Sequence, residues 1–373
     1  MKEYKRLGDY IREVNVRNRD LKVTKLMGIN IDKYFMPSVA NVIGTDLSNY
    51  KLVSKTQFAC NLMHVGRDER IPMAMHIDVE PIIVSPAYFV FEVVDLDVLL
   101  PEYLMMWFSR KEFDRNAWFY TDADVRGGMD RKELMDMQLP IPSITRQREI
   151  VAEYETLTQR IRLNEQIIQN LETTAQTLYR KMFVDGIDKE NLPEGWRMGT
   201  LSNIADITMG QSPDGETYNF DKEGIIFYQG RTDFGGRFPT ARVYTTSPTR
   251  CAKEGDVLLS VRAPVGDINI ASHDCCIGRG LASLRSKYKC QSYLYYQLQN
   301  LSSVFNISDD EGTIFGSITK EDLYSIDVII PSEREIKEFE NIVSMLDVEI
   351  KFKDREISYL EELQSLLLAK MGQ

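Results

Sequence analysis

The sequence predicts a duplicated fold of two mixed α/β (α+β) domains joined by two long antiparallel coiled-coil helices. Two observations support this prediction. Two charged, proline-free runs follow the same kind of junction peptide, at residues 139–143 and 328–332 of the 373-residue chain. The segments before these runs mix short strand-like and helical patterns, as α/β domains do. At roughly 100–200 residues per domain, the chain is long enough for two.

Four segments follow one another. We expect a first α/β domain over residues 1–142 and a central helix over 143–186, then a second α/β domain over 187–331 and a C-terminal helix over 332–373. The opening peptides of the two domains correspond, LGDYI at 7–11 with LSNIA at 201–205. Helices fit Glu102 to Arg110 and Gln291 to Leu301. Strand-like runs occupy residues 82–84, 88–91, 224–228 and 257–261.

The two helical runs begin alike and share one register. Each follows an apolar strand that ends in Pro-Ser (LPIPS and VIIPS), which is expected to stop the strand and cap the helix. Apolar residues then recur in alternating steps of four and three, the a/d spacing of a coiled coil. An offset of 189 residues maps one seam onto the other: Ile150, Tyr154, Leu157, Ile161, Asn164, Ile168, Leu171, Ala175, Leu178 and Met182; and Phe339, Val343, Leu346, Ile350, Lys353, Ile357, Leu360, Gln364, Leu367 and Met371.

Each seam would be roughly 50 Å long at 1.5 Å per residue, and one helix cannot bury such a stripe alone. The simplest partner is the other helix, and the pair is antiparallel if the domains lie at its opposite ends. The residues assigned to helix pairing and partner docking are Ile150, Leu157, Ile161, Leu171, Leu346, Ile350, Leu360 and Leu367. Asn164 and Lys353 form a polar layer that either sets the register at a cost in stability or is simply tolerated in the seam.

Composition excludes several classes of protein. The 43% hydrophobic and 27% charged fractions are typical of a globular protein and not of a fibre or a disordered chain. The charged start has no apolar signal core, and no window is apolar enough to span a membrane. Five scattered cysteines, an odd number, favour a reducing compartment, so we expect a cytoplasmic protein with no membrane partner.

The net charge of −11 is unevenly distributed. Residues 1–33 carry nine Lys/Arg against five Asp/Glu, and residues 230–290 carry ten against five, whereas residues 332–373 carry six against ten. Base is therefore concentrated in the domains and acid in the C-terminal helix. Because phosphates respond to fields within about 10 Å at moderate salt, this distribution is compatible with a nucleic-acid partner.

The sequence lacks the common catalytic and metal-binding motifs. The chain has no Pro-Pro dipeptide for an amino-methyltransferase pocket, no phosphate loop and no Gly-x-Gly-x-x-Gly. The one tight His/Cys cluster, residues 273–276 (HDCC), lacks a second cluster for zinc, so buried thiols on a strand are the better interpretation. His64 and His76 have no paired nucleophile. Glu335 with Lys337, and Glu349 with Lys351, resemble the end of a nuclease motif but lie on the heptad helices, where residues two apart do not converge.

Three peptides carry a family resemblance. Residues 192–197 (LPEGWR), continuing to 199–201 (GTL) and Ile204, look like the opening of a target recognition domain in the specificity (S) subunits of type I restriction-modification systems. Residues 255–262 (GDVLLSVR), followed by 264–267 (PVGD), are similar as well. Residues 125–134 (VRGGMDRKEL), leading to 147–151 (QREIV), resemble that family's junction into its central helix. The first domain lacks the Pro-Glu-Gly-Trp opening, which leaves its first strand in doubt.

The resemblance implies an assembly. Such subunits bind double-stranded DNA at a bipartite site, one half per target recognition domain, and hold methyltransferase (M) subunits through the helices. Restriction/translocase (R) subunits join that complex. The chain itself is then non-catalytic and has no cofactor, since S-adenosylmethionine, ATP and Mg belong to the partner subunits.

Candidate DNA-contacting residues are those that commonly read bases or phosphates. In the second domain a glycine-rich loop after a strand presents Gln229, Arg231 and Arg237 and continues to Arg242, although an ordinary charged hairpin is an equally good interpretation. Arg262 and Arg279 could equally support the fold. In the first domain the candidates are Arg17, Arg19, Lys22, Arg67 and Arg70.

Two other classes of function compete with this one. A non-catalytic coiled-coil scaffold that tethers non-DNA partners would not need basic loops on an acidic chain. An enzyme with a fused recognition module would need the catalytic motifs that the sequence lacks.

Overall fold

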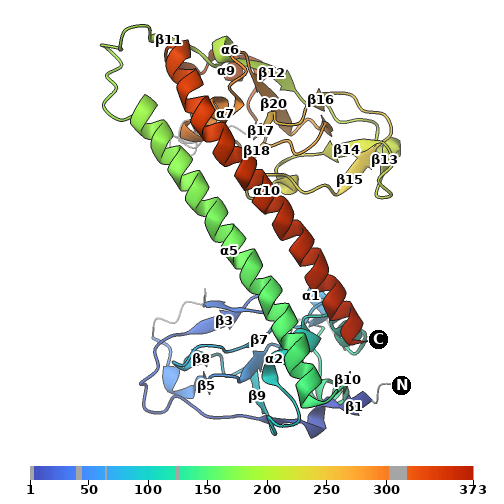
Figure 1. The fold of residues 1–373 in the computed structure, drawn as a ribbon. Coiled ribbons are helices and arrows are strands. Elements are labelled where there is room, and N and C mark those ends of the chain that lie inside the picture. Colours follow the sequence, from blue (N-terminus) through green and yellow to red (C-terminus); the bar gives the residue numbers. More distant parts are fainter. Residues whose placement is uncertain (1–3, 39–43, 64, 122–126, 302–316, 373) are drawn as a thin grey trace. The chain divides into compact units, whose positions relative to one another are not determined.

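The computed structural model describes residues 4–38, 44–63, 65–121, 127–301 and 317–372. The chain divides into two compact units, Met1–Glu165 with Arg355–Gln373, and Gln166–Asp354. Each unit contains one globular region and a part of both long helices (Figure 1). The units therefore cut across the helices, where the sequence-based division treated helices and domains as separate segments.

The two long helices are α5 (Ile144–Phe183) and α10 (Glu333–Met371). Both start at the expected serine. The hydroxyl of Ser143 accepts a hydrogen bond from the backbone N–H of Arg146, and that of Ser332 accepts one from Glu335. These bonds satisfy one of the unpaired N–H groups at each helix start, so the Pro-Ser junctions act as the predicted caps.

The first unit is built on a four-stranded antiparallel sheet in the order β2-β9-β6-β7. Its strands are β2 (Ile11–Glu13), β9 (Phe89–Val93), β6 (Phe58–Cys60) and β7 (Met73–Met75), and α2 (Pro101–Phe108) lies against β7. Phe58, Phe91 and Phe108 pack together in its core. The remaining elements are β1 (Tyr4–Arg6), η1 (Leu7–Asp9), β3 (Met27–Ile29), β4 (Phe35–Pro37), η2 (Leu47–Asn49), β5 (Lys51–Val53), α1 (Val65–Asp68), β8 (Ile82–Val84), α3 (Lys111–Phe119), α4 (Arg131–Asp136) and β10 (Gln138–Pro140).

The second unit repeats this sheet as β12-β20-β17-β18 and adds a five-stranded sheet in the order β13-β15-β14-β19-β16. The first of these contains β12 (Ala205–Met209), β20 (Leu281–Ser286), β17 (Val257–Ser260) and β18 (Ile268–Ile270). The second contains β13 (Tyr218–Asn219), β15 (Val243–Thr245), β14 (Ile225–Tyr228), β19 (Cys275–Ile277) and β16 (Cys251–Ala252). The other elements are β11 (Arg197–Thr200), α6 (Leu201–Ile204), η3 (Gly215–Thr217), η4 (Arg231–Asp233), α7 (Gln291–Asn300), α9 (Lys320–Ser325) and β21 (Asp327–Ile330).

The duplication extends to a small sheet that leads into each long helix. In the first unit β1 pairs antiparallel with β10, and Tyr4 lies opposite Pro140. In the second unit β11 pairs antiparallel with β21, and Met198 lies opposite Ile329. The first strand of the first domain is therefore present, although its sequence lacks the Pro-Glu-Gly-Trp opening. Strand pairing uses backbone groups, so it survives the loss of that motif.

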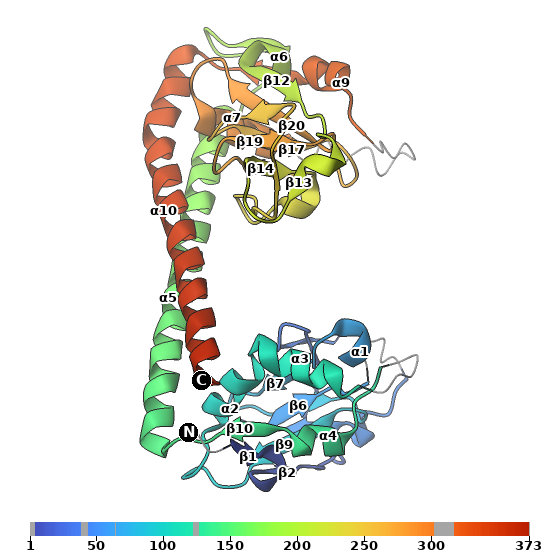
Figure 2. The same cartoon turned by 90° about the vertical axis from the view of Figure 1, so that its right-hand side faces the viewer.

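Within each unit the two long helices pack side by side and antiparallel (Figure 2). In the first unit Ile150, early in α5, shares a core with Met371 at the end of α10, and further along Arg160 pairs with Glu356 at 2.7 Å. In the second unit the Phe183 ring, at the end of α5, lies 5.5 Å from Phe339, early in α10. Residue numbers thus rise along one helix as they fall along the other. The predicted fold class is confirmed.

The heptad seam is buried or half-buried at every predicted position of both helices. Asn164 is 1% exposed, and its Nδ2 has no acceptor among the described residues. A buried amide without a partner costs stability, as a polar residue in a seam is expected to do. Lys353 is half-buried and lies 3.7 Å from Glu349 of its own helix. The role of this layer in setting the register stays a prediction.

One buried polar side chain fixes each helix to its globular region. The Gln147 amide, which is fully buried, accepts a hydrogen bond from Leu100 N and donates one to Val98 O, immediately before α2. In the second unit the Glu340 carboxylate accepts from the N–H groups of Ser292 and Tyr293 at the start of α7. In both units the long helix thus supplies a hydrogen-bond acceptor for backbone N–H groups at the N-terminal end of a short helix, α2 or α7.

Candidate nucleic-acid interface

The candidate interface starts at the one parallel pair of strands among the described residues, β14 and β19. Their register places Tyr228 beside Ile277, and Gly278 N donates a hydrogen bond to Tyr228 O at 2.8 Å. Because parallel strands end at the same edge of a sheet, the peptides that follow them run next to each other there. Gln229 and Arg279 are consequently both exposed on neighbouring loops.

The close approach of these loops requires glycine. A Cβ atom at Gly278 or at Gly280 would lie 2.9 Å from the carbonyl oxygen of Gln229. Real Cβ atoms do not come so near a backbone oxygen, so both positions favour a residue without a side chain. Arg279 stands between the two glycines, and it is exposed.

A third loop joins this edge from the four-stranded sheet. Val261 N donates to Gly280 O at 2.9 Å, which brings the next residue, Arg262, beside the glycine turn. Arg231 also lies here, and it pairs with Asp267 of the loop that follows Arg262. Arg231 and Arg262 are both exposed. Three loops thus present one glutamine and three arginines at this edge: Gln229, Arg231, Arg262 and Arg279.

Asp233 holds the glycine-rich loop in shape. Its carboxylate is 3% exposed and accepts a hydrogen bond from Gln229 N at 2.7 Å through Oδ2. The other oxygen accepts from Arg242 Nε at 3.0 Å. This ion pair with Asp233 holds Arg242 against the loop, and about half of the Arg242 side chain stays exposed. The loop lies between β14 and β15, which pair antiparallel as in a hairpin, and its role in DNA reading stays a prediction.

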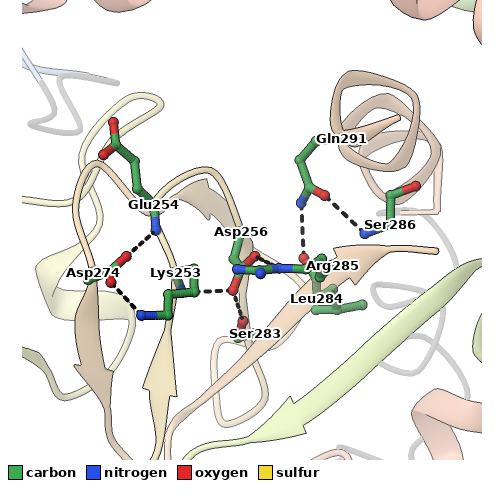
Figure 3. Close-up of polar contacts among 9 residues, drawn as sticks. All are labelled: Lys253, Glu254, Asp256, Asp274, Ser283, Leu284, Arg285, Ser286 and Gln291. Atoms are coloured by element: carbon green, nitrogen blue, oxygen red, sulfur yellow. Dashed lines mark hydrogen bonds and ion pairs between the residues drawn. The ribbon is translucent and has the colours of Figure 1, made fainter. Parts of the chain in front are cut away.

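A network around Asp256 supports the sheet beneath these loops (Figure 3). The Asp256 carboxylate, which is 5% exposed, accepts hydrogen bonds from Lys253 N, Ser283 Oγ and Arg285 Nε. Gly255 precedes it with φ +88°, a conformation that favours glycine. The Gly-Asp peptide at the start of β17 is therefore a turn with a buried acceptor, and it serves the fold and not DNA contact.

The first unit contains the same turn with different chemistry. Gln57, at the start of β6, accepts from Ser54 N and donates to Glu92 of β9. Glu92 in turn pairs with Arg12 of β2. Glu92 of β9 thus stands at the position that Arg285 occupies in β20. Gln57 stands at the position of Asp256. The two globular regions therefore share the backbone structure of this turn, but the charged residue beside it is acidic in the first region and basic in the second.

Comparison with known proteins agrees with the duplicated fold. Residues 193–362 match the family model described as the type I restriction modification DNA specificity domain. A putative type I restriction enzyme specificity subunit, MjaX of Methanocaldococcus jannaschii, is 28% identical over 361 residues, covering 90% of this chain and 82% of that protein. A second specificity subunit of that organism, MjaIX, is 21% identical over 187 residues, covering 47% of this chain and 43% of that protein.

A solved structure shares the fold. The S subunit of a type I restriction-modification system from M. genitalium has a TM-score of 0.62 and 13% identity, covering 100% of this chain and 96% of that one. The chain is thus similar to type I restriction-modification specificity subunits over most of its length. Its second globular region and most of α10 lie within the family match, and the MjaX relationship extends over the first region as well.

One predicted DNA contact in the second globular region, Arg237, is wrong. Arg237 is 4% exposed and is turned toward the long helices, where it pairs with Asp347 of α10 at 2.5 Å and with Glu172 of α5 at 3.3 Å. Its guanidinium also lies over the Tyr295 ring, 4.3 Å from the centroid. Burial by itself lowers the pKa of Arg237, but the neighbouring Tyr295 and Asp347 outweigh that effect and raise it. A guanidinium enclosed in this way cannot reach a nucleic acid.

The candidates in the first unit are exposed or half-exposed but do not gather at one edge. Arg17 and Arg19 both bond to Asn49. The others pair with acids: Lys22 with Asp20, Arg67 with Asp68 and Arg70 with Asp32. The hydrogen bond that Lys22 donates to Asp20 raises the pKa of Lys22, so this ammonium stays charged. These five residues remain predictions as DNA contacts.

From the sequence, Arg262 and Arg279 could equally support the fold. The structure gives them exposed side chains beside Gln229 and Arg231. The Gly-Arg-Gly spacing of residues 278–280 is the signal that could have found Arg279, because glycines on both sides of an arginine indicate a close backbone approach.

The helices also expose apolar residues that the heptad analysis missed. The seam residues assigned to partner docking face the other helix within each unit. Outward on α10 lie Ile342, Met345, Val348 and Phe352, which are 48%, 67%, 71% and 59% exposed. The residues 189 positions earlier in α5 are Glu153, Thr156, Gln159 and Leu163, so this outer stripe belongs to α10 and has no equivalent of similar hydrophobicity.

No cluster of three His, Cys, Asp or Glu that could hold a metal occurs among the described residues. Cys275 and Cys276 are buried on β19, and burial raises the pKa of the Cys275 thiol to about 12. His76 is buried with its Nε2 on Glu80 O, and His64 lies outside the described residues. None of the described helices is long and apolar enough to cross a membrane.

Proposed function

We propose that this chain is a specificity subunit that reads a bipartite DNA site, one half with each globular region, and performs no chemistry itself. The observation that carries the proposal is the edge formed by Gln229, Arg231, Arg262 and Arg279. Arginine can bind guanine through O6 and N7, and glutamine can bind adenine through N6 and N7. Loops fixed by glycine contacts and by Asp233 can hold such side chains in the geometry that base reading requires.

The long helices are proposed to bind methyltransferase subunits. The outer apolar stripe of α10 supports this role, because exposed apolar side chains in steps of three and four suit an amphipathic partner helix. S-adenosylmethionine, ATP and Mg would then be held by methyltransferase and restriction/translocase subunits. A cytoplasmic location follows from this role and stays part of the proposal.

A reconstitution experiment tests both parts. The purified chain is incubated with DNA and labelled S-adenosylmethionine, alone and with a type I methyltransferase subunit from the same host. Methyl transfer is expected only when both proteins are present. The methyltransferase alone is the matched control.

Two outcomes would contradict the proposal. Methyl incorporation by the rigorously purified chain would show that it is an enzyme. A stable complex that neither binds nor methylates DNA would favour the alternative, a coiled-coil scaffold that tethers non-DNA partners.

A further inference from the structure

The first unit contains an apolar cavity of about 410 Å³ where β10 runs into α5. Its walls are Tyr103, Pro140, Pro142, Ile150, Leu367 and Met371, from α2, the β10–α5 junction and α10. Arg146 stands at its rim with about half of its side chain exposed. The remaining charged residues of the lining are Lys5, Lys370 and Glu153, so the rim carries three basic groups and one acidic group.

The matching place in the second unit is full. The offset of 189 maps Pro142, Arg146 and Ile150 onto Pro331, Glu335 and Phe339. There the Trp196 side chain is 9% exposed, and its indole Nε1 donates a hydrogen bond to Glu335 Oε2 at 2.6 Å. Phe183 packs beside it, with ring centroids 6.0 Å apart. Two aromatic rings thus occupy this corner of the second unit.

The sequence positions of the first unit that correspond to these two rings are not aromatic. The same offset places Gly372 at the position of Phe183. The strand registers match Tyr4 with Met198, so the residue that corresponds to Trp196 is Lys2. Residues 1–3 lie outside the described part of the chain. The backbone frame of the corner is therefore duplicated, but its aromatic filling is not.

The rim charge is also reversed. Where Glu335 accepts a hydrogen bond from an indole N–H, the first unit has Arg146, which can only donate. A ligand for this corner must combine an apolar ring with a hydrogen-bond acceptor, and a carboxylate suits an arginine best. We propose that the cavity docks an aromatic side chain next to a carboxylate, carried by an extended segment of a partner polypeptide.

Two short peptides test the proposal on the full-length chain. One is acetyl-Leu-Pro-Glu-Gly-Trp-Glu, which copies residues 192–196 and ends in Glu where the chain has Arg197, and the other has Ala in place of Trp. Both carry a fluorophore, and binding is measured by anisotropy. The tryptophan peptide is expected to bind at least tenfold more tightly than the alanine peptide.

Charge reversal at the rim identifies the site. Arg146→Glu restores the residue type of the second unit, so it should weaken the acidic peptide by about tenfold and strengthen the same peptide ending in Arg. Because Arg146 is on the surface, this variant is expected to fold. Arg148→Glu, an exposed change of the same charge outside the cavity lining, should alter neither affinity.

Equal binding of the tryptophan and alanine peptides, no binding of either, or equal effects of Arg146→Glu and Arg148→Glu would overturn the proposal. Binding that appears only when residues 2 and 3 are deleted would overturn it too, because the chain's own amino terminus would then be the occupant. DNA recognition plays no part in these measurements, so their result is independent of the proposed function.

Discussion

Arg237 of the second globular region and Asp347 of α10 form an ion pair of 2.5 Å, and Arg237 is 4% exposed. The same guanidinium reaches Glu172 of α5 at 3.3 Å. One arginine thus joins the globular region of the second unit to segments of both long helices. Its sequence position predicts a DNA contact, so variants of Arg237 separate a structural role from a role in recognition.

Removing this arginine should destabilise the second unit. Arg237→Met leaves the Asp347 carboxylate, which is largely buried, without its partner, and losing one member of a buried pair costs about 3–5 kcal/mol. Thermal unfolding followed by circular dichroism should show a clear decrease in Tm. Arg231→Met, at a half-exposed arginine of the same loop, is the control and should unfold like the parent protein. Equal melting of the two variants would mean that the Arg237 ion pairs contribute nothing to stability.

The instability of Arg237→Met should depend on pH. Burial raises the pKa of Asp347 above its usual range, and Arg237 opposes that rise. Without Arg237 the folded-state pKa of Asp347 rises further. A carboxyl whose pKa is raised on folding stabilises the fold below its unfolded pKa, and this contribution is lost as pH rises through the folded pKa. The Tm deficit of the variant should therefore be smaller at about pH 5 than at about pH 7.5. A deficit independent of pH would contradict this assignment.

The misplacement of Arg237 shows what a sequence can and cannot predict. Heptad spacing repeats along both helices, and a 189-residue offset relates them, so the helices, their caps and their antiparallel pairing follow from local patterns. The direction of a single arginine in an irregular loop has no periodic signal. Its burial depends on Glu172 and Asp347, which lie 65 and 110 residues away.

The interface at the loop edge was only partly predictable for a similar reason. Gln229 and Arg231 stand directly after a strand and were candidates from the sequence. Arg262 and Arg279 lie beside them because β14 and β19 are parallel and β17 pairs with β20. No local sequence pattern predicts those strand pairings. Likewise, the replacement of Asp256 by Gln57 and of Arg285 by Glu92 is visible only once the two turns are seen to be equivalent.

The two faces of α10 should respond differently to a charge. Leu360→Glu places a carboxylate in the half-buried seam and should lower the stability of the fold by roughly 2 kcal/mol or more. Leu171→Glu is the corresponding change in α5. Met345→Glu, on the outer stripe where the side chain is 67% exposed, should leave the Tm unchanged.

Recovery of the methyltransferase subunit in co-purification distinguishes the faces further. Met345→Glu is expected to reduce recovery although the chain stays folded, because the charge lies on the surface proposed for docking. Thr156→Glu changes the position 189 residues earlier in α5, which is already polar, and serves as the matched control. Full recovery with Met345→Glu would exclude the outer stripe as a docking surface.

The most direct test of DNA reading is genome-wide methylation mapping of a reconstituted system that carries Arg279→Ala or Arg231→Ala. A base-reading arginine should cost about 1–3 kcal/mol when removed and should relax one base position. A phosphate contact should instead weaken all sites alike. The account predicts that relaxation is confined to one half of a bipartite motif, while Arg237→Ala reduces methylation at all sites without changing the motif. Changes in both halves of the motif, or an unchanged motif with every variant, would contradict it.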